Sequence, residues 1–202
     1  DISSVKGSVI VKDFSAEKFK MHLTSDEVNV IEILPGGVVT KKAAAHIQLD
    51  ENGEFVRNPE EDLVKVAVVE RHQGTGNVAC GFLKGYGIKE GAVALSVAHD
   101  SHNIIVVGVN DEEMEFAVNS LIAQEGGIVL VKEGKVIEQM PMPIAGLMSD
   151  QSGEWVDEKL TSIHEKAYTE LGICGDVEPV MTLCFMSLAV IPEIKLTDMG
   201  LF

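Results

Sequence analysis

The fold is decided around residues 92–109, which read AVALSVAHDSHNIIVVGV. Two short apolar runs, Ala92–Leu95 and Ile104–Val109, flank a segment rich in polar side chains. Short apolar or β-branched runs near glycine are typical of buried strands. The segment between them, Ser96–Asn103, is called the octet below. We expect it to connect two strands at one end of a sheet, where ligand contacts are commonly placed.

The composition limits the classes of partner. With 202 residues, 46% of them hydrophobic, the chain can form one domain, or one domain with a small appendage, around a sizeable core. It carries 32 acidic and 16 basic residues, for a net charge of −16. That charge repels phosphate groups, so we exclude nucleic acids and anionic membranes as partners. The apolar stretches are too short or too interrupted to span a bilayer.

The cysteines indicate a reducing compartment. Cys80, Cys174 and Cys184 have no paired spacing, and we predict buried free thiols, no disulfide framework and a cytoplasmic location. The chain begins at Asp1 without an initiator methionine, so we expect it to be a piece of a longer polypeptide.

Residues 1–57 are predicted to form a β-rich lead-in. Expected turns are Pro35–Gly37 and Asp50–Gly53, which contain residues that favour turns. The expected strands lie at Val9–Val11, Phe19–Leu23, Val28–Leu34, Val38–Thr40 and Ala44–Leu49.

Residues 58–202 are predicted to form an α/β C-terminal domain. The expected strands, besides the two that flank the octet, are Val64–His72, Val78–Phe82 and a hairpin of Ile128–Val131 with Lys135–Gln139. The expected helices are Asp111–Glu125, with Asn110 and Glu113 as a capping box, Gly153–Leu171, and a short buried helix within Met181–Val190. The predicted class is α+β, with a mixed, largely antiparallel sheet and packed helices.

The octet is the densest group of reactive side chains in the chain: His99, Asp100, Ser101, His102 and Asn103. Three interpretations are open. The histidines and Asp100 could chelate a metal, but a catalytic zinc usually needs three protein ligands, and no further marker is present. The octet could line a pocket completed by another part of the protein, which we favour. It could also be a structural turn tied by Asp100 and Asn103. We predict no metal site here.

A second group follows the strand that begins at Val64. Glu70, Arg71 and His72 precede the glycine-rich Gly74-Thr75-Gly76. Such a loop can hold phosphate, but no helix start and no lysine follow it. Arg71 is one of two arginines in the chain, and we expect it to pair with a buried carboxylate at the strand end.

Two further features favour structural roles. The segment from Met140 to Met148 is rich in methionine and proline and is predicted to be an intramolecular packing element. His164 lies beside the apolar stripe of the second long helix, and we predict a packed helix histidine there.

Long blocks of the chain, in order, resemble the C-terminal part of bacterial adenine deaminases of the amidohydrolase superfamily. The resemblance spans about residues 28–202. The matching blocks are Val68–His72 with Gly74–Asn77, Gly81–Gly87, Ser96–Ile104 with Val106–Gly108, Asn110–Glu112, Pro141–Ser149, and Met181–Asp198 with Gly200–Leu201.

The resemblance implies a function for a longer protein. Enzymes of this family hydrolyse the exocyclic amine of adenine to give hypoxanthine and ammonia, a reaction of purine salvage. They use a divalent metal centre, manganese or iron, in an N-terminal (β/α)₈ barrel. The His-x-His motif and the catalytic aspartate of that barrel have no counterpart in these residues. The implied partners are that barrel, adenine and further copies of the protein.

Two hypotheses follow for this chain. In the first it is the accessory C-terminal domain of an adenine deaminase, with no catalytic residue, metal ligand or cofactor of its own and no activity by itself. The octet then faces the mouth of the barrel, and the residues expected near the substrate are His99, Asp100, Ser101, His102, Asn103, Arg71 and His72. In the second it is an independent, non-catalytic module that binds a small molecule or a subunit.

Overall fold

The computed structural model of the protein describes residues 2–202, and one large sheet dominates it. The sheet has eight strands in the order β10-β9-β7-β8-β5-β6-β1-β2, and all neighbours are antiparallel except β1 and β6. Their bounds are β1 Glu27–Ile33, β2 Thr40–His46, β5 Leu63–Val69, β6 Val78–Lys84, β7 Ala92–Leu95, β8 Ile104–Gly108, β9 Gly127–Lys132 and β10 Lys135–Pro141. The predicted α+β class with a mixed, largely antiparallel sheet is confirmed.

Both faces of the central strands are buried. In β5, Val64, Val66 and Val68 face one hydrophobic core, whereas Ala67 and Val69 face another on the opposite side. Because side chains alternate along a strand, a strand covered on both faces becomes a continuous apolar run. This explains why the strands around the octet are uniformly apolar.

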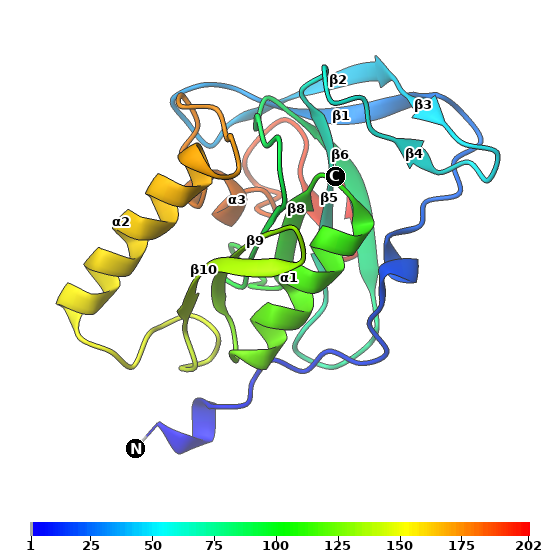
Figure 1. The fold of residues 1–202 in the computed structure, drawn as a ribbon. Helices are drawn as coiled ribbons and strands as arrows, with labels where there is room; N and C mark the ends of the chain where they lie inside the picture. Colours follow the sequence, from blue (N-terminus) through cyan, green and yellow to red (C-terminus); the bar gives the residue numbers. More distant parts are fainter. Residues whose placement is uncertain (1) are drawn as a thin grey trace.

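Three α-helices cover the sheet: α1 Asp111–Ala123, α2 Gly153–Thr169 and α3 Met181–Cys184. The apolar side of α1 belongs to the core that contains Ala67 and Val69, whereas α2 and α3 contribute to the opposite core. Figure 1 shows α2 standing beside the edge strand β10. The Asn110 side chain accepts a hydrogen bond from Glu113 N (2.8 Å), and Ser152 caps α2 in the same way through Trp155 N (3.3 Å).

The remaining elements are short. They are the 3₁₀ turns η1 Ser3–Val5 and η2 Ala16–Phe19, the hairpin of β3 Gln48–Leu49 with β4 Phe55–Val56, and the hairpin of β11 Leu196–Thr197 with β12 Gly200–Leu201. No helix among residues 2–202 is long and apolar enough to cross a membrane.

Three predicted strands are wrong. Residues 9–11 are irregular, residues 19–23 hold only the end of η2, and of residues 38–40 only Thr40 is in a strand. Val9, Val11 and Phe19 instead pack against the α1 core. The short buried helix predicted within Met181–Val190 is confirmed as α3; it ends at Cys184, and tight turns follow it in the rest of the segment. Its apolar content reflects burial of the turns against the sheet rather than a longer helix.

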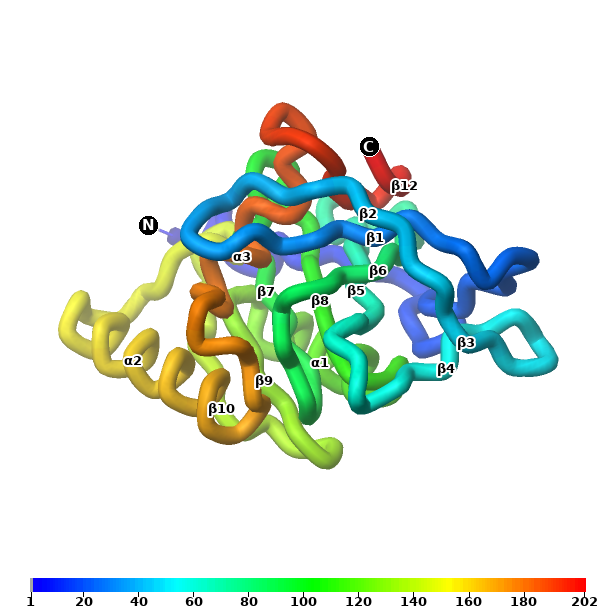
Figure 2. The backbone as a smooth tube through the Cα atoms, turned by 90° about the horizontal axis from the view of Figure 1, so that it is seen from above, coloured from blue at the N-terminus to red at the C-terminus, as the bar shows by residue number. Residues whose placement is uncertain are grey.

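The lead-in is built into the main sheet. β1 pairs with β6, and β2 forms the sheet edge, where Thr40 N donates to Pro192 O (3.2 Å). Figure 2 shows the C-terminal segment beside β2. The division of the chain at residues 57 and 58 stays a prediction, and the structure adds that both segments share one sheet.

Candidate functional site

The site begins at the end of β5, where Arg71 is 1% exposed. Its guanidinium donates to three carbonyl oxygens: His102 O (2.5 Å), Ala145 O (3.1 Å) and Ser8 O (3.5 Å). The expected pairing with a buried carboxylate is therefore wrong. Arg71 ties three distant segments together through backbone oxygens, which satisfy a buried guanidinium without a second buried charge. Burial lowers its pKa, and the nearby Glu70 charge opposes that shift.

Gly146 makes room for this guanidinium. It has φ +71°, and a Cβ atom there would lie 2.7 Å from Arg71 Nη1. Its carbonyl oxygen also accepts a hydrogen bond from Ser96 Oγ (2.5 Å). The methionine-rich segment therefore packs against both the start of the octet and the end of β5.

Glu70 organises the glycine-rich loop. Its carboxylate accepts hydrogen bonds from His72 N (2.5 Å), Gln73 N (2.8 Å), Thr75 N (3.0 Å) and Thr75 Oγ1 (3.1 Å). Burial raises the pKa of Glu70, but these bonds outweigh burial and lower the pKa to about 2. The loop amides thus surround an anion of the protein itself, which accounts for the glycines without a phosphate.

The octet connects β7 to β8 at the same sheet end. Its backbone is held by His99 N, which donates to Cys184 O (2.8 Å), and by His102 N, which donates to Ala98 O (2.6 Å). The His99 ring stacks on Phe185 at 4.8 Å between centroids and meets the His102 ring edge-on at 5.1 Å. Two imidazoles therefore lie side by side over the α3 region.

Asn103 is the residue that ties the connection to its surroundings. It is buried, accepts from Arg71 N (3.3 Å), and donates to Asp198 Oδ1 (3.2 Å). Asp100 has no such role: its side chain is 85% exposed, and its one ion pair among residues 2–202 is with His99, at 3.9 Å. Ser101 is exposed, and its carbonyl oxygen lies 2.7 Å from His72 Nε2.

All seven predicted site residues therefore meet at one end of the sheet. The side chains of His72, His99, Asp100 and Ser101 remain accessible, while Arg71 and Asn103 are buried supports. Phe185 and Asp198 also contact the octet and were not predicted. They lie more than 80 positions along the chain from their partners, and no local pattern marks such contacts.

His102 has one ring nitrogen without a hydrogen-bond partner. It is half-buried, and its Nδ1 is a buried atom without a hydrogen-bond partner. Burial lowers the pKa of His102, and the nearby His99 and Arg71 charges lower it further. Because the ordinary value is already below neutrality, the imidazole is neutral at pH 7 and can donate and accept a hydrogen bond.

The octet does not fit a metal ion. Among residues 2–202 no group of three or more His, Cys, Asp or Glu side chains could hold one. A zinc-type site needs three or four ligands that converge on one point, whereas here the two imidazoles meet edge-on and the Asp100 side chain is 85% exposed.

The other singled-out residues have structural explanations. His164 Nδ1 lies 2.6 Å from Leu160 O, and its Nε2 contacts Glu178, as expected of a packed helix histidine. Cys184 is buried and Cys80 half-buried, and burial raises the pKa of each thiol to about 12. Cys174 is exposed, which corrects the prediction that all three thiols are buried.

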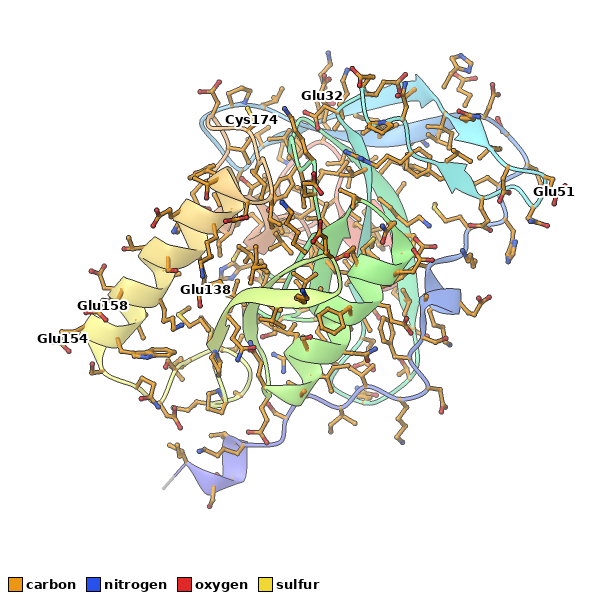
Figure 3. All side chains as sticks on the ribbon, viewed as in Figure 1. Glu32, Glu51, Glu138, Glu154, Glu158 and Cys174 are labelled. Atoms are coloured by element: carbon orange, nitrogen blue, oxygen red, sulfur yellow. The ribbon has the colours of Figure 1, made fainter. Side chains whose placement is uncertain are left out.

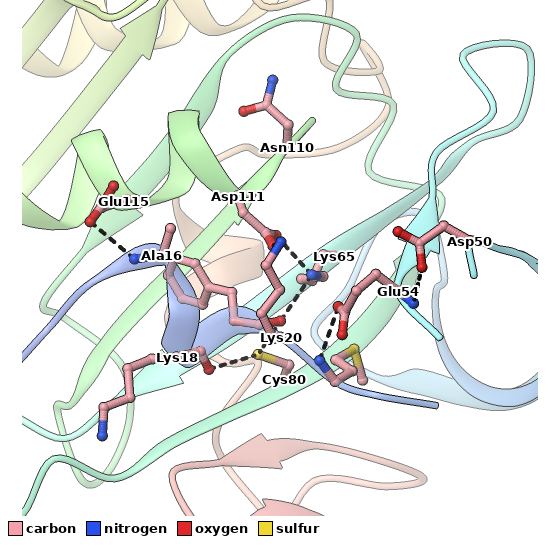
Figure 4. Close-up of polar contacts among 12 residues, drawn as sticks. Ala16, Lys18, Lys20, Asp50, Glu54, Lys65, Cys80, Asn110, Asp111 and Glu115 are labelled. Carbon is pink, nitrogen blue, oxygen red and sulfur yellow. Dashed lines mark hydrogen bonds and ion pairs between the residues drawn. The ribbon is translucent and has the colours of Figure 1, made fainter. Parts of the chain in front are cut away.

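A second polar cluster lies at the start of α1 (Figure 4). It is at the opposite end of β8 from the octet, since the octet precedes β8 and α1 follows it. Lys65 is 5% exposed, and its ammonium donates to Asp111 (2.7 Å) and Phe19 O (2.9 Å). Asp111 also pairs with Lys20 (3.2 Å), which raises the pKa of Lys20. The sequence contained one sign of this cluster, because Lys65 interrupts an otherwise apolar strand. These charges satisfy one another and fasten the lead-in to α1.

The geometry defines an α+β domain with an imidazole-rich connection at one sheet end. Residues 37–202 match the family described as the adenine deaminase C-terminal domain. The chain belongs to this family.

Curated relatives agree with that assignment. The chain is 68% identical over 202 residues to "Adenine deaminase 2" of Desulfotalea psychrophila, which it covers to 35% of its length. It is 50% identical over 200 residues to "Adenine deaminase" of Ligilactobacillus salivarius, and 43% identical over 201 residues to "Adenine deaminase 2" of Carboxydothermus hydrogenoformans. Each match takes in 99% or 100% of this chain and 35% of the relative. The chain thus spans about a third of the length of these relatives.

Proposed function

We propose that the chain is the C-terminal domain of an adenine deaminase, which hydrolyses adenine to hypoxanthine and ammonia in cytoplasmic purine salvage. The catalytic barrel lies outside these residues, and the whole protein is a homo-oligomer. A divalent metal, manganese or iron, supplies the activated hydroxide when bound in the barrel.

Within that enzyme, we place the octet at the mouth of the active site. One observation supports this placement. The accessible imidazoles of His72 and His99 and the unpartnered Nδ1 of His102 lie together at one end of the sheet. The fold does not need them there, because Arg71 and Asn103 already make the structural hydrogen bonds. A connection that only had to turn the chain could use Asn, Asp and Gly.

The chemistry suits a purine. A neutral imidazole presents one donor and one acceptor, which complements the ring nitrogens and amine of adenine, and it can help to position a water molecule for proton transfer.

The test is His99→Ala and His102→Ala in the full-length enzyme. Each variant should lower kcat/KM for adenine more than about tenfold, or above roughly 1.4 kcal/mol, with nearly unchanged Tm and metal content. The matched control is His46→Ala, a histidine whose side chain is 76% exposed on the edge strand β2 and which should leave kcat/KM unchanged. Full activity of the octet variants with a lowered Tm would make the octet a structural turn only.

A further inference from the structure

The apolar stripe of α2 is buried along only half its length. Ile163 and Ala167, in the C-terminal half, are fully buried against the sheet. Leu160 and Val156, one and two turns earlier on the same stripe, are only partly buried. Residues three, four and seven positions apart share one helix face, so the same face is covered at one end and open at the other.

Between the open half of α2 and the sheet lies a groove of about 270 Å³. Its floor is formed by Leu95, Ile128 and Met140, all at most 2% exposed. Met142 and Met181 form its sides, and Met181 is 51% exposed. Methionine side chains adapt to irregular apolar partners and are common at binding surfaces.

The polar side chains that line the groove already have hydrogen-bond partners within the domain. His164 bonds to Leu160 O and Glu178, and Glu178 also accepts from Met181 N. A purine or another polar small molecule would bury donors and acceptors there without partners, at a cost of about 1–3 kcal/mol for each group. The groove therefore suits aliphatic or aromatic side chains.

A second copy of the chain is a poor occupant. The net charge is −16, and the outer side of α2 adds Glu154 and Glu158, which point away from the sheet (Figure 3). Two such acidic surfaces would repel each other on approach.

The N-terminal segment contacts the stretch of chain between Met142, in the wall of the groove, and the start of α2. Ala145 N donates to Val5 O (2.9 Å), and Lys6 pairs with Asp150 (3.3 Å) in the segment that leads into α2. Figure 1 shows η1 and the start of α2 at the same end of the molecule. A polypeptide that continues before these residues would leave the domain beside the groove.

We infer that the groove receives apolar side chains from the part of the same polypeptide that lies outside residues 1–202. The inference rests on the proposed function, in which the chain is one domain of a longer enzyme, and about two thirds of the relatives' length lies outside the match. The groove also adjoins the octet, since Val97 and Cys184 line it and Cys184 O accepts from His99 N. Docking here holds the octet against the catalytic part.

The first experiment measures coverage in the full-length enzyme. Val156→Cys places a thiol in the groove, and Lys159→Cys places one on the same helix, also half-exposed but outside the groove. Maleimide labelling, located by peptide mass mapping, should be at least tenfold slower at position 156. Equal rates would overturn the inference. If Val156→Cys does not fold, Met142→Cys in the facing wall replaces it.

The second experiment identifies the occupant. A benzophenone amino acid at position 181 should crosslink within one chain to a peptide outside residues 1–202. A crosslinked dimer, or adducts only within residues 1–202, would overturn the inference. Neither readout depends on turnover. An enzyme protected at position 156 but inactive on adenine would contradict the proposed function alone, whereas an active enzyme labelled equally at both positions would contradict the docking alone.

Discussion

Two polar connections leave the same end of the sheet and differ in how their polar groups are used. In the loop after β5, the Glu70 carboxylate accepts four hydrogen bonds from its own loop, and Arg71 binds three carbonyl oxygens. In the octet, the backbone and Asn103 hold the structure, while Asp100 points to solvent and His102 Nδ1 has no partner.

The comparison distinguishes polar residues that stabilise the fold from polar residues that are available for binding. Both segments are rich in charged and hydrogen-bonding residues, so residue type alone does not distinguish them. The distinction lies in whether the fold satisfies each group. A buried group with a full set of partners stabilises the native state, whereas a group that the fold leaves without partners is free to bind something else. The following predictions test that distinction.

The largest expected effect is on Arg71. Arg71→Met should lower the free energy of unfolding by more than about 3 kcal/mol, because three carbonyl oxygens lose a buried donor. Urea unfolding of the chain measures this. The other arginine is the control: Arg57 is half-exposed and donates one bond, to Ile88 O (3.1 Å), so Arg57→Met should cost less than about 1 kcal/mol. Similar losses in the two variants would refute the role assigned to Arg71.

Glu70 should give the next largest effect, and it depends on pH. Its pKa falls from 4.5 to about 2 on folding, so its stabilisation is present above about pH 4.5 and is lost as the pH falls toward 2. At 1.36 kcal/mol per pKa unit this amounts to about 3 kcal/mol. Glu70→Gln should therefore be destabilising at pH 7, and its difference from the wild type should shrink between pH 4.5 and 2. A constant difference over that range would show that the carboxylate charge is irrelevant.

His102 should contribute little to stability at pH 7. Its pKa is lowered on folding, so protonation opposes the folded state, and stability that is complete above pH 6.5 falls as the pH decreases below it. His102→Gln should change the free energy of unfolding at pH 7 by less than about 1 kcal/mol and should weaken the loss below pH 6.5. Urea unfolding at pH 7 and pH 5 tests this; an unchanged pH dependence would contradict it.

Asp100 should give the smallest effect on stability. Its carboxylate is solvent-exposed and makes one long contact, so Asp100→Ala should change the free energy of unfolding by less than about 0.5 kcal/mol. Thermal unfolding of both variants measures this. Asn103→Ala, which removes two buried hydrogen bonds, is the reference for a large loss of stability. Equal losses at the two positions would mean that Asp100 ties the turn after all.

Local patterns determined much of the sheet and the long helices. The apolar runs at Ala92–Leu95 and Ile104–Gly108 became strands, Lys132–Gly134 connected a hairpin, and Asn110 began α1. These elements could be predicted because strand alternation, glycine turns and helix caps depend on residues within a few positions of each other.

The sequence by itself also placed the polar residues at strand ends and carried a specific family resemblance, which the match over residues 37–202 confirms. Only the tertiary structure decided what those residues do to one another. It directed Arg71 to carbonyl oxygens instead of a carboxylate, brought Phe185 and Asp198 onto the octet, and left half of the α2 stripe open. Such contacts join positions tens of residues apart, and they arise from the packing of whole elements, which no local pattern encodes.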